Sequence, residues 1–301
     1  MINISKKTLQ DLEFESVIIQ VASHNVTSLG KTAILETIPF SKRTNVVEAL
    51  QLTNEFLASF ENENRIPNHG FDAITKELKL IKIENNYLEI DGFRKIVSIC
   101  ITTNVLLKFF NKFHEYYPLL HGHSSQIESN TSIFDAINSV IDKYGEIRND
   151  ASDTLYTVRK SIQAVRTKVN TSFNSALSMY NSADYLDDIR ETVMENRRVL
   201  AVKAMYRRKV KGAIMGGSKT GSIVYIEPET TLQHSRELNN LEYEEKEEVV
   251  KILKELTNHI RLFLPLLKNY QAFLTKIDLI SAFEDFTLSY LRSAFSYSPF
   301  L

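Results

Sequence analysis

Residues 196–226 have the sequence NRRVLAVKAMYRRKVKGAIMGGSKTGSIVYI, which breaks two patterns that hold elsewhere in the chain. The stretch contains eight lysines and arginines and no acidic residue, whereas the 301-residue chain has a formal net charge of −1, so the rest of the chain carries −9. It also alternates like a strand and is interrupted by glycines, while its flanks repeat at helical spacing. The stretch therefore predicts a small basic β element set between two long helices.

Both flanks carry an apolar stripe in which residues recur every three or four positions. The first stripe covers residues 155–173 and the second covers residues 238–263, after Pro228 has ended the last strand. Each helix has about 30 residues and would span roughly 45 Å. We expect the two stripes to pack antiparallel, as a helical arm that carries the basic β element at its tip.

The rest of the chain shows further helical patterns, and only 9 glycines and 6 prolines favour long unbroken elements. A polar connector is expected over residues 118–132, and other helices near residues 8–24, 28–35, 44–62, 71–84, 91–116, 133–142 and 265–295. The last helix must pack back onto the first ones. The sequence thus predicts a mainly α protein: a helical bundle core (residues 1–148 and 265–301) with an inserted long antiparallel helical arm (residues 149–264) whose small basic β tip spans residues 196–228.

The composition, 43% hydrophobic and 24% charged, is typical of a soluble protein with a real core. The single cysteine, Cys100, excludes an intrachain disulfide and a cysteine-rich zinc site, and it lies in an apolar run, which predicts a buried thiol. No stretch is long and apolar enough to suggest a membrane span. We expect a cytoplasmic protein with no membrane partner.

Two short catalytic patterns are present but lack their context. Ser28-Leu29-Gly30-Lys31 and Lys219-Thr220-Gly221 match the S-x-x-K and K-T-G elements of penicillin-recognising serine enzymes, which also need a mixed sheet between them. A phosphate loop at residues 212–220 fails because Ser218, not glycine, precedes Lys219. We expect no catalytic residue in this chain, and a serine hydrolase using Ser28 and Lys219 stays an alternative.

Metal binding has weak support in the sequence. His121 and His123, with His114 upstream, have no Cys, Asp or Glu cluster at ligand spacing, which favours solvated loop histidines. The glutamates of residues 242–248 lie early in a helix and favour a solvated acidic face. No metal site is predicted.

The basic residues of the stretch are the candidate binding residues. Cations concentrated on a β unit with little core of its own would repel one another unless a polyanion neutralised them. Arginine and lysine grip phosphates without reading sequence, and the few interleaved aromatic residues give less support to base stacking. A surface hairpin with merely solubilising charges is the alternative. The candidate nucleic-acid-binding residues are Arg197, Arg198, Lys203, Arg207, Arg208, Lys209, Lys211 and Lys219.

Several segments together resemble a known family. Residues 212–228 resemble the pattern G-x-V-H-D-x-S-x-S-G-x-T-x-[FY]-[IV]-E-P at the same length, and residues 196–203 resemble the strand before it. Residues 11–14 (DLEF) and 28–31 (SLGK) match near the start. The chain resembles the core (lever) and clamp domains of the MutS-type DNA mismatch repair proteins, and most of all the second bacterial paralogue, MutS-II.

The resemblance covers essentially the whole chain and carries several implications. Met215-Gly216 stands where the family usually has His-Asp, and Lys219-Thr220 replaces a serine-rich turn. Family members continue into an ATPase domain, which binds ATP and Mg²⁺, and often into a nuclease domain. We expect this chain to end before the ATPase, near residues 296–299, to hold no cofactor itself, and to belong to a homodimer when full length.

The leading hypothesis is a DNA-binding clamp that grips duplex or branched DNA by its backbone and couples to the missing ATPase domain. A second hypothesis replaces DNA with ribosomal RNA, as the resemblance to MutS-II implies, because MutS-II-like proteins are also associated with the rescue of stalled ribosomes. A third is a purely structural dimerisation lever with no ligand at its tip.

Overall fold

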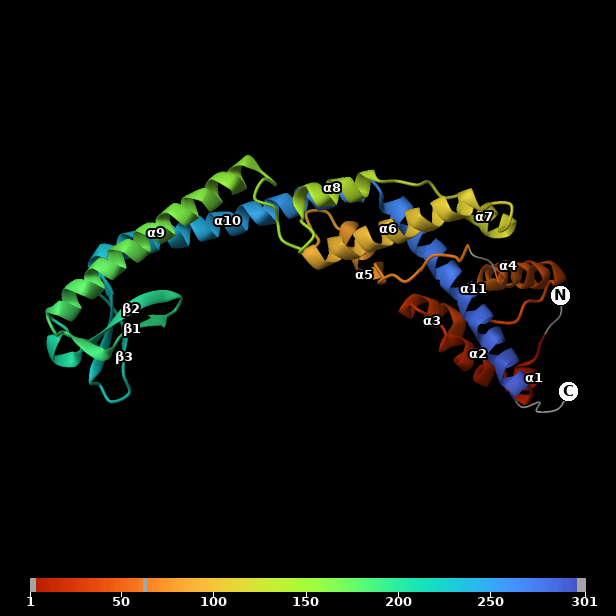
Figure 1. Ribbon diagram of the computed structural model, residues 1–301, viewed down its shortest axis with the longest axis horizontal. Helices are drawn as coiled ribbons and strands as arrows, with labels where there is room; N and C mark the ends of the chain where they lie inside the picture. The colour runs from red at the N-terminus through yellow and green to blue at the C-terminus, as the bar shows by residue number, and fades with distance from the viewer. Residues whose placement is uncertain (1–3, 62–63, 297–301) are drawn as a thin grey trace. The chain divides into compact units, whose positions relative to one another are not determined.

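The computed structural model describes residues 4–61 and 64–296 (Figure 1). The chain forms two compact units: unit 1 consists of the residues up to Glu146 together with those from Leu253 onward, and unit 2 consists of Ile147–Ile252. The prediction of a mainly helical protein with a small β element is confirmed. The chain end expected near Tyr297 and Pro299 lies outside the described residues. None of the helices in the described ranges is long and apolar enough to cross a membrane.

Unit 1 is a helical bundle built around its last helix. That helix, α11, contacts α2, α3, α4, α5 and α6. Its Leu267, Tyr270 and Leu274 are buried, as are Phe93 and Ile96 of α6. The helices of unit 1 are α1 (Lys6–Asp11), α2 (Phe14–Ala22), α3 (Ser28–Leu35), α4 (Arg43–Glu61), α5 (Thr75–Ile81), α6 (Ile90–Lys112), α7 (Pro118–Ser124), α8 (Ser132–Val140) and α11 (Leu264–Ser296).

Three helix predictions in unit 1 need correction. The single helix expected over residues 8–24 is two helices, because Glu13 adopts a left-handed backbone with φ of 52° between α1 and α2. The connector expected over residues 118–132 contains α7, which begins at Pro118, a residue suited to the first turn of a helix. The helix expected from residue 71 begins only at Thr75.

A buried carboxylate of α11 connects the C-terminal helix of unit 1 to the N-terminal part of the same unit. Asp278 accepts hydrogen bonds from the backbone N–H groups of Val26 and Thr27 at 2.9 and 3.0 Å, from the Thr27 hydroxyl, and from His69 at 3.3 Å. Burial acts to raise the pKa of Asp278, but these hydrogen bonds outweigh it and lower the pKa. Gly30 of the SLGK segment is needed here, since a methyl group on it would lie 2.6 Å from Cγ of Asp278.

Unit 2 is an antiparallel helix pair with a sheet at one end. Its elements are α9 (Asp153–Ser182), β1 (Leu186–Met194), β2 (Arg197–Lys203), the 3-10 turn η1 (Ala204–Tyr206), β3 (Gly212–Gly217), β4 (Ile223–Pro228) and α10 (Glu229–Arg261), whose last residues belong to unit 1. Figure 1 shows α9 and α10 side by side. The Ser152 hydroxyl caps α9 by accepting from the Leu155 N–H.

Charged pairs between α9 and α10 fix how the two helices lie together. Arg159 donates to Glu245 at 2.7 Å and Arg166 donates to Glu242 at 2.9 Å, while the Ser152 hydroxyl donates to Glu248. The acidic run of α10, interpreted from the sequence as a solvated face, is therefore in part an interhelical seam.

The sheet is antiparallel throughout, with strand order β1-β2-β4-β3. The last turns of α9 cover one face, where Phe173 and Tyr180 pack with Leu200, Val202 and Ile226 in one buried cluster. Burying each such side chain stabilises by about 1.5–3 kcal/mol. The sheet extends beyond the expected range of residues 196–228, since β1 lies before it; its register with β2 shifts between Leu186 and Glu191.

Candidate nucleic-acid interface

Three of the eight predicted binding residues are engaged with carboxylates. Arg197 donates to Glu227 at 3.0 Å, and Glu227 is fully buried. Arg198 donates to Glu191 at 2.6 Å, and its guanidinium lies 4.2 Å from the centre of the Phe173 ring. Both arginines have side chains that are less than one-third exposed.

Lys203 is the third engaged cation. It donates to the Asp184 carboxylate at 2.8 Å, and this hydrogen bond, with the charge of Asp184, raises the pKa of Lys203. Because no acidic residue lies within residues 196–226, all eight cations were expected to lack counterions. That premise is wrong for these three, since their partners Asp184, Glu191 and Glu227 lie outside the stretch and are brought to it by the fold.

The other five predicted residues form a second group, here called the free cations. All five side chains are exposed, and none has an ion pair or side-chain hydrogen bond to any residue in the described part of the chain. Four lie in the segment between η1 and β3, and one lies on the β3–β4 hairpin. The free cations are Arg207, Arg208, Lys209, Lys211 and Lys219.

The segment that carries four free cations is held in place by its own backbone and by one apolar side chain. Arg207 and Lys209 donate backbone N–H groups to the carbonyls of Ala204 and Tyr206, and Ala204 donates to the carbonyl of Ser222. Val210 between them is buried in the cluster under α9. The charged side chains therefore point outward from an anchored loop.

Lys219 lies on a polar hairpin turn. The hydroxyls of Ser218, Thr220 and Ser222 lie 2.8–3.5 Å from one another, and Gly221 has φ of 71°, a conformation that favours glycine. Ser28, the other residue of the serine hydrolase hypothesis, begins α3 in unit 1, whereas Lys219 belongs to unit 2.

Three stacked tyrosines adjoin the segment that carries four free cations; Tyr206 is one of the few aromatic residues interleaved with the cations, whereas Tyr180, Tyr185 and the stacking itself were not predicted. The rings of Tyr185 and Tyr206 are stacked with centroids 4.8 Å apart, and the rings of Tyr180 and Tyr185 are stacked with centroids 6.4 Å apart. Tyr180 and Tyr185 lie outside residues 196–226. The sequence gives no signal for the contact of these two rings with Tyr206, because Tyr206 comes near them only after β2 has folded back beside α9.

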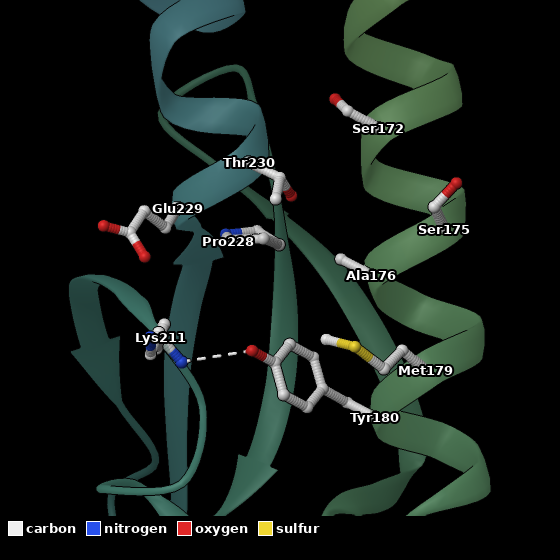
Figure 2. A pocket seen from close by; sticks show the side chains of 9 residues that line it. All are labelled: Ser172, Ser175, Ala176, Met179, Tyr180, Lys211, Pro228, Glu229 and Thr230. Atoms are coloured by element: carbon white, nitrogen blue, oxygen red, sulfur yellow. Dashed lines mark hydrogen bonds between the residues drawn. The ribbon is translucent and has the colours of Figure 1, made fainter.

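A hollow of about 310 Å³ lies beside Lys211, between the last turns of α9 and the start of α10 (Figure 2). The Tyr180 hydroxyl accepts a hydrogen bond from the backbone N–H of Lys211 at 3.2 Å, and Met179 lies above the Tyr180 ring. The residues that line it are Ser172, Ser175, Ala176, Met179, Tyr180, Lys211, Pro228, Glu229 and Thr230. The hollow brings Lys211 and Glu229 together with four side chains that carry a hydroxyl group.

The histidines considered as metal ligands lie on or near α7, which is a helix rather than the expected loop. His123 lies 3.4 Å from Glu48 and 3.0 Å from Lys276, and burial together with the charge of Lys276 lowers its pKa. His121 packs against His114. Within residues 4–61 and 64–296, no group of three or more His, Cys, Asp or Glu side chains is placed to hold a metal ion.

Several known proteins are similar to this chain in sequence. No protein-family model matches it. A MutS2 protein of Bacillus subtilis (strain 168) is 28% identical over 257 residues, which are 84% of this chain and 33% of the relative. This chain is similar to MutS2 proteins. Endonuclease MutS2 of Geobacillus sp. (strain WCH70) is 26% identical over 92% of this chain and 35% of its own length.

Endonuclease MutS2 of Aquifex aeolicus (strain VF5) is 27% identical over 85% of this chain and 33% of its own length. The chain thus spans about a third of the length of these MutS2 relatives. The similarity supports a relationship to the MutS2 proteins, which the sequence analysis named as MutS-II.

Proposed function

We propose that this chain is the core and clamp part of a MutS2-like protein, and that unit 2 binds DNA through the free cations without reading its sequence. The observation that carries the proposal is that five exposed cations have no ion pair in the described residues, while the neighbouring cations do. An endonuclease, as the relatives are named, cuts nucleic acid, so a nucleic-acid-binding segment is expected in such a protein.

The ion pairs of the sheet support a division of the predicted binding residues into two groups. Residues 184–229 contain nine basic and seven acidic residues, so this part of unit 2 is only mildly basic overall. Binding therefore depends on where the unpaired charge lies rather than on net charge. We assign phosphate contacts to Arg207, Arg208, Lys209, Lys211 and Lys219, and a role in holding the sheet together to the three engaged cations.

The remaining parts of the proposal concern the longer protein. The helix pair α9–α10 would carry DNA occupancy to an ATPase domain that binds ATP and Mg²⁺, and the longer protein would act as a homodimer in the cytoplasm. The chain itself would bind and not cut, since the short catalytic patterns at Ser28 and Lys219 lack their partners.

Fluorescence anisotropy of a labelled 30-bp duplex, titrated with the full chain, tests the proposal. Each phosphate contact lowers the slope of log affinity against log salt by about 0.9, so five contacts predict a slope of about −4.5. The variant Arg207→Glu/Arg208→Glu/Lys209→Glu should bind at least about 100-fold more weakly at 50 mM salt. A matched control, Lys76→Glu/Lys79→Glu/Lys82→Glu, makes the same charge change on exposed lysines of unit 1.

The control should bind almost as tightly as the unaltered chain. A slope near zero, or equal binding by the two variants, would refute the proposal. Competition by ribosomal RNA far more strongly than by DNA would instead assign the free cations to an RNA partner.

A further inference from the structure

The turn η1 exposes an apolar side chain directly before the segment that carries four of the free cations. Met205 is 77% exposed, although it lies directly between the buried strand β2 and the free cations. Tyr206 follows it and is partly exposed. A single exposed apolar side chain is ordinary on a protein surface. What distinguishes Met205 is its position beside an aromatic ring and three consecutive cations.

Tyr206 is the outer ring of a supported stack. Its ring lies 4.8 Å from Tyr185 with 28° between the planes, and Tyr185 lies 6.4 Å from Tyr180 with 30° between the planes. Tyr180 is 9% exposed and its hydroxyl is fixed by the N–H of Lys211. Among the described residues, no other ring or cation is stacked on Tyr206.

The surroundings of Tyr206 select a negatively charged ligand. Arg207, Arg208 and Lys209 follow it directly and are exposed without ion pairs in the described part of the chain. Hydrogen bonds from Ala204 to Ser222 and from Lys209 to Tyr206 fix the backbone on both sides of the ring. The site therefore combines a rigid aromatic surface, an exposed thioether and fixed positive charge within one short segment.

These properties match an unpaired nucleotide. Each base has a π-face that stacks on aromatic side chains irrespective of sequence, and its phosphate suits the adjacent cations. Methionine is among the apolar side chains that contact bases where stacking is interrupted. In a continuous duplex the base faces are already stacked on their neighbours, so only the phosphates remain accessible to this segment.

We propose that Met205 and Tyr206 contact unpaired bases, so that this part of unit 2 prefers DNA with a single-stranded segment over continuous duplex. This inference rests on the proposed function, because the same free cations supply the phosphate contacts. It adds a preference for unpaired DNA, which contacts with DNA phosphates alone would not produce.

The test compares a 30-bp duplex with the same duplex carrying a five-nucleotide gap, using the full chain. Stacking of one base predicts that the gapped DNA binds about tenfold more tightly. Tyr206→Ala and Met205→Ala should each reduce this ratio toward one while leaving the affinity for continuous duplex within about twofold. Tyr206→Phe keeps the ring and should keep the ratio.

A fluorescent base analogue, 2-aminopurine, placed in the gap gives a direct readout of stacking. Its fluorescence should be quenched by the unaltered chain and by Tyr206→Phe, but not by Tyr206→Ala. Equal affinity of the unaltered chain for gapped and continuous DNA, or an affinity ratio unchanged in both alanine variants, would overturn the inference. If binding to continuous duplex still depended on salt, the proposed function would stand. Absence of binding to either DNA would overturn both.

Discussion

The ion pair between Arg197 and Glu227 allows a test of whether Arg197 stabilises the fold or binds nucleic acid. In Arg197→Met the partner of a fully buried carboxylate disappears. Removing one member of a buried ion pair costs about 3–5 kcal/mol, and we expect about 3 kcal/mol here because Arg197 is 27% exposed and water can approach. The second carboxylate oxygen of Glu227 is buried with no hydrogen-bond partner in the described residues, so the remaining protein cannot compensate.

Hydrogen exchange measured by mass spectrometry on the full chain is the suitable assay, because two compact units need not unfold together. Peptides from β2 and β4 should lose protection in Arg197→Met, while those from α6 should not. Adding Glu227→Gln removes the buried charge and should recover about 2 kcal/mol of local stability.

The control is Arg208→Met, which removes an exposed cation with no ion pair and should change local stability by less than about 0.5 kcal/mol. It should, however, weaken DNA binding. Unchanged protection of β2 and β4 in Arg197→Met would refute the structural role given to this arginine, and loss of protection in Arg208→Met would refute the division into two groups.

Four further predictions concern unit 1. Asp278→Asn should lower the free energy of unfolding by about 3 kcal/mol in urea at pH 7, because buried donors lose a charged acceptor; a loss below about 1 kcal/mol would contradict this. The pKa of Asp278 is lowered in the folded protein, so its contribution to the free energy of unfolding is complete above the ordinary value of 3.8. This contribution is lost as the pH falls through the pKa of the folded state, and urea titrations between pH 6 and pH 3 measure the loss. Gly30→Ala should destabilise unit 1 by about 2 kcal/mol through overlap with Asp278, whereas Gly122→Ala, with open space around it, should not. Burial raises the pKa of Cys100 to about 12, so a thiol reagent at pH 8 should modify it only in urea, and rapid reaction of the folded chain would contradict its burial.

Local patterns in the sequence predicted the elements that depend on local physics. The apolar stripes of residues 155–173 and 238–263 repeat at helical spacing, and the structure has the helices α9 and α10 there, joined by Arg159–Glu245 and Arg166–Glu242 hydrogen bonds. Pro228 ends β4 as expected. These features depend on neighbouring residues, and so a single sequence is enough to indicate them.

Contacts between distant residues could not be predicted in the same way. Arg197 forms a hydrogen bond with Glu227, 30 residues later, and Val26 forms one with Asp278, 252 residues later. Both contacts exist only in the folded chain. β1 escaped prediction because its pairing is irregular and Arg190 within it has φ of 60°. The free cations were among the predicted residues, but their separation from Arg197, Arg198 and Lys203 required the positions of the carboxylates.

The hydrogen bond between Ser152 and Glu248 has a consequence for how such a chain could be rearranged. Because it holds the two ends of unit 2 together at 2.8 Å between side-chain oxygens, the chain enters and leaves this unit at neighbouring points. A segment with adjacent ends can be removed and replaced by a short linker, or transplanted into a loop of another protein. Unit 2 therefore has the geometry of an exchangeable cassette, one that recombination could gain, lose or replace without rethreading the helices of unit 1.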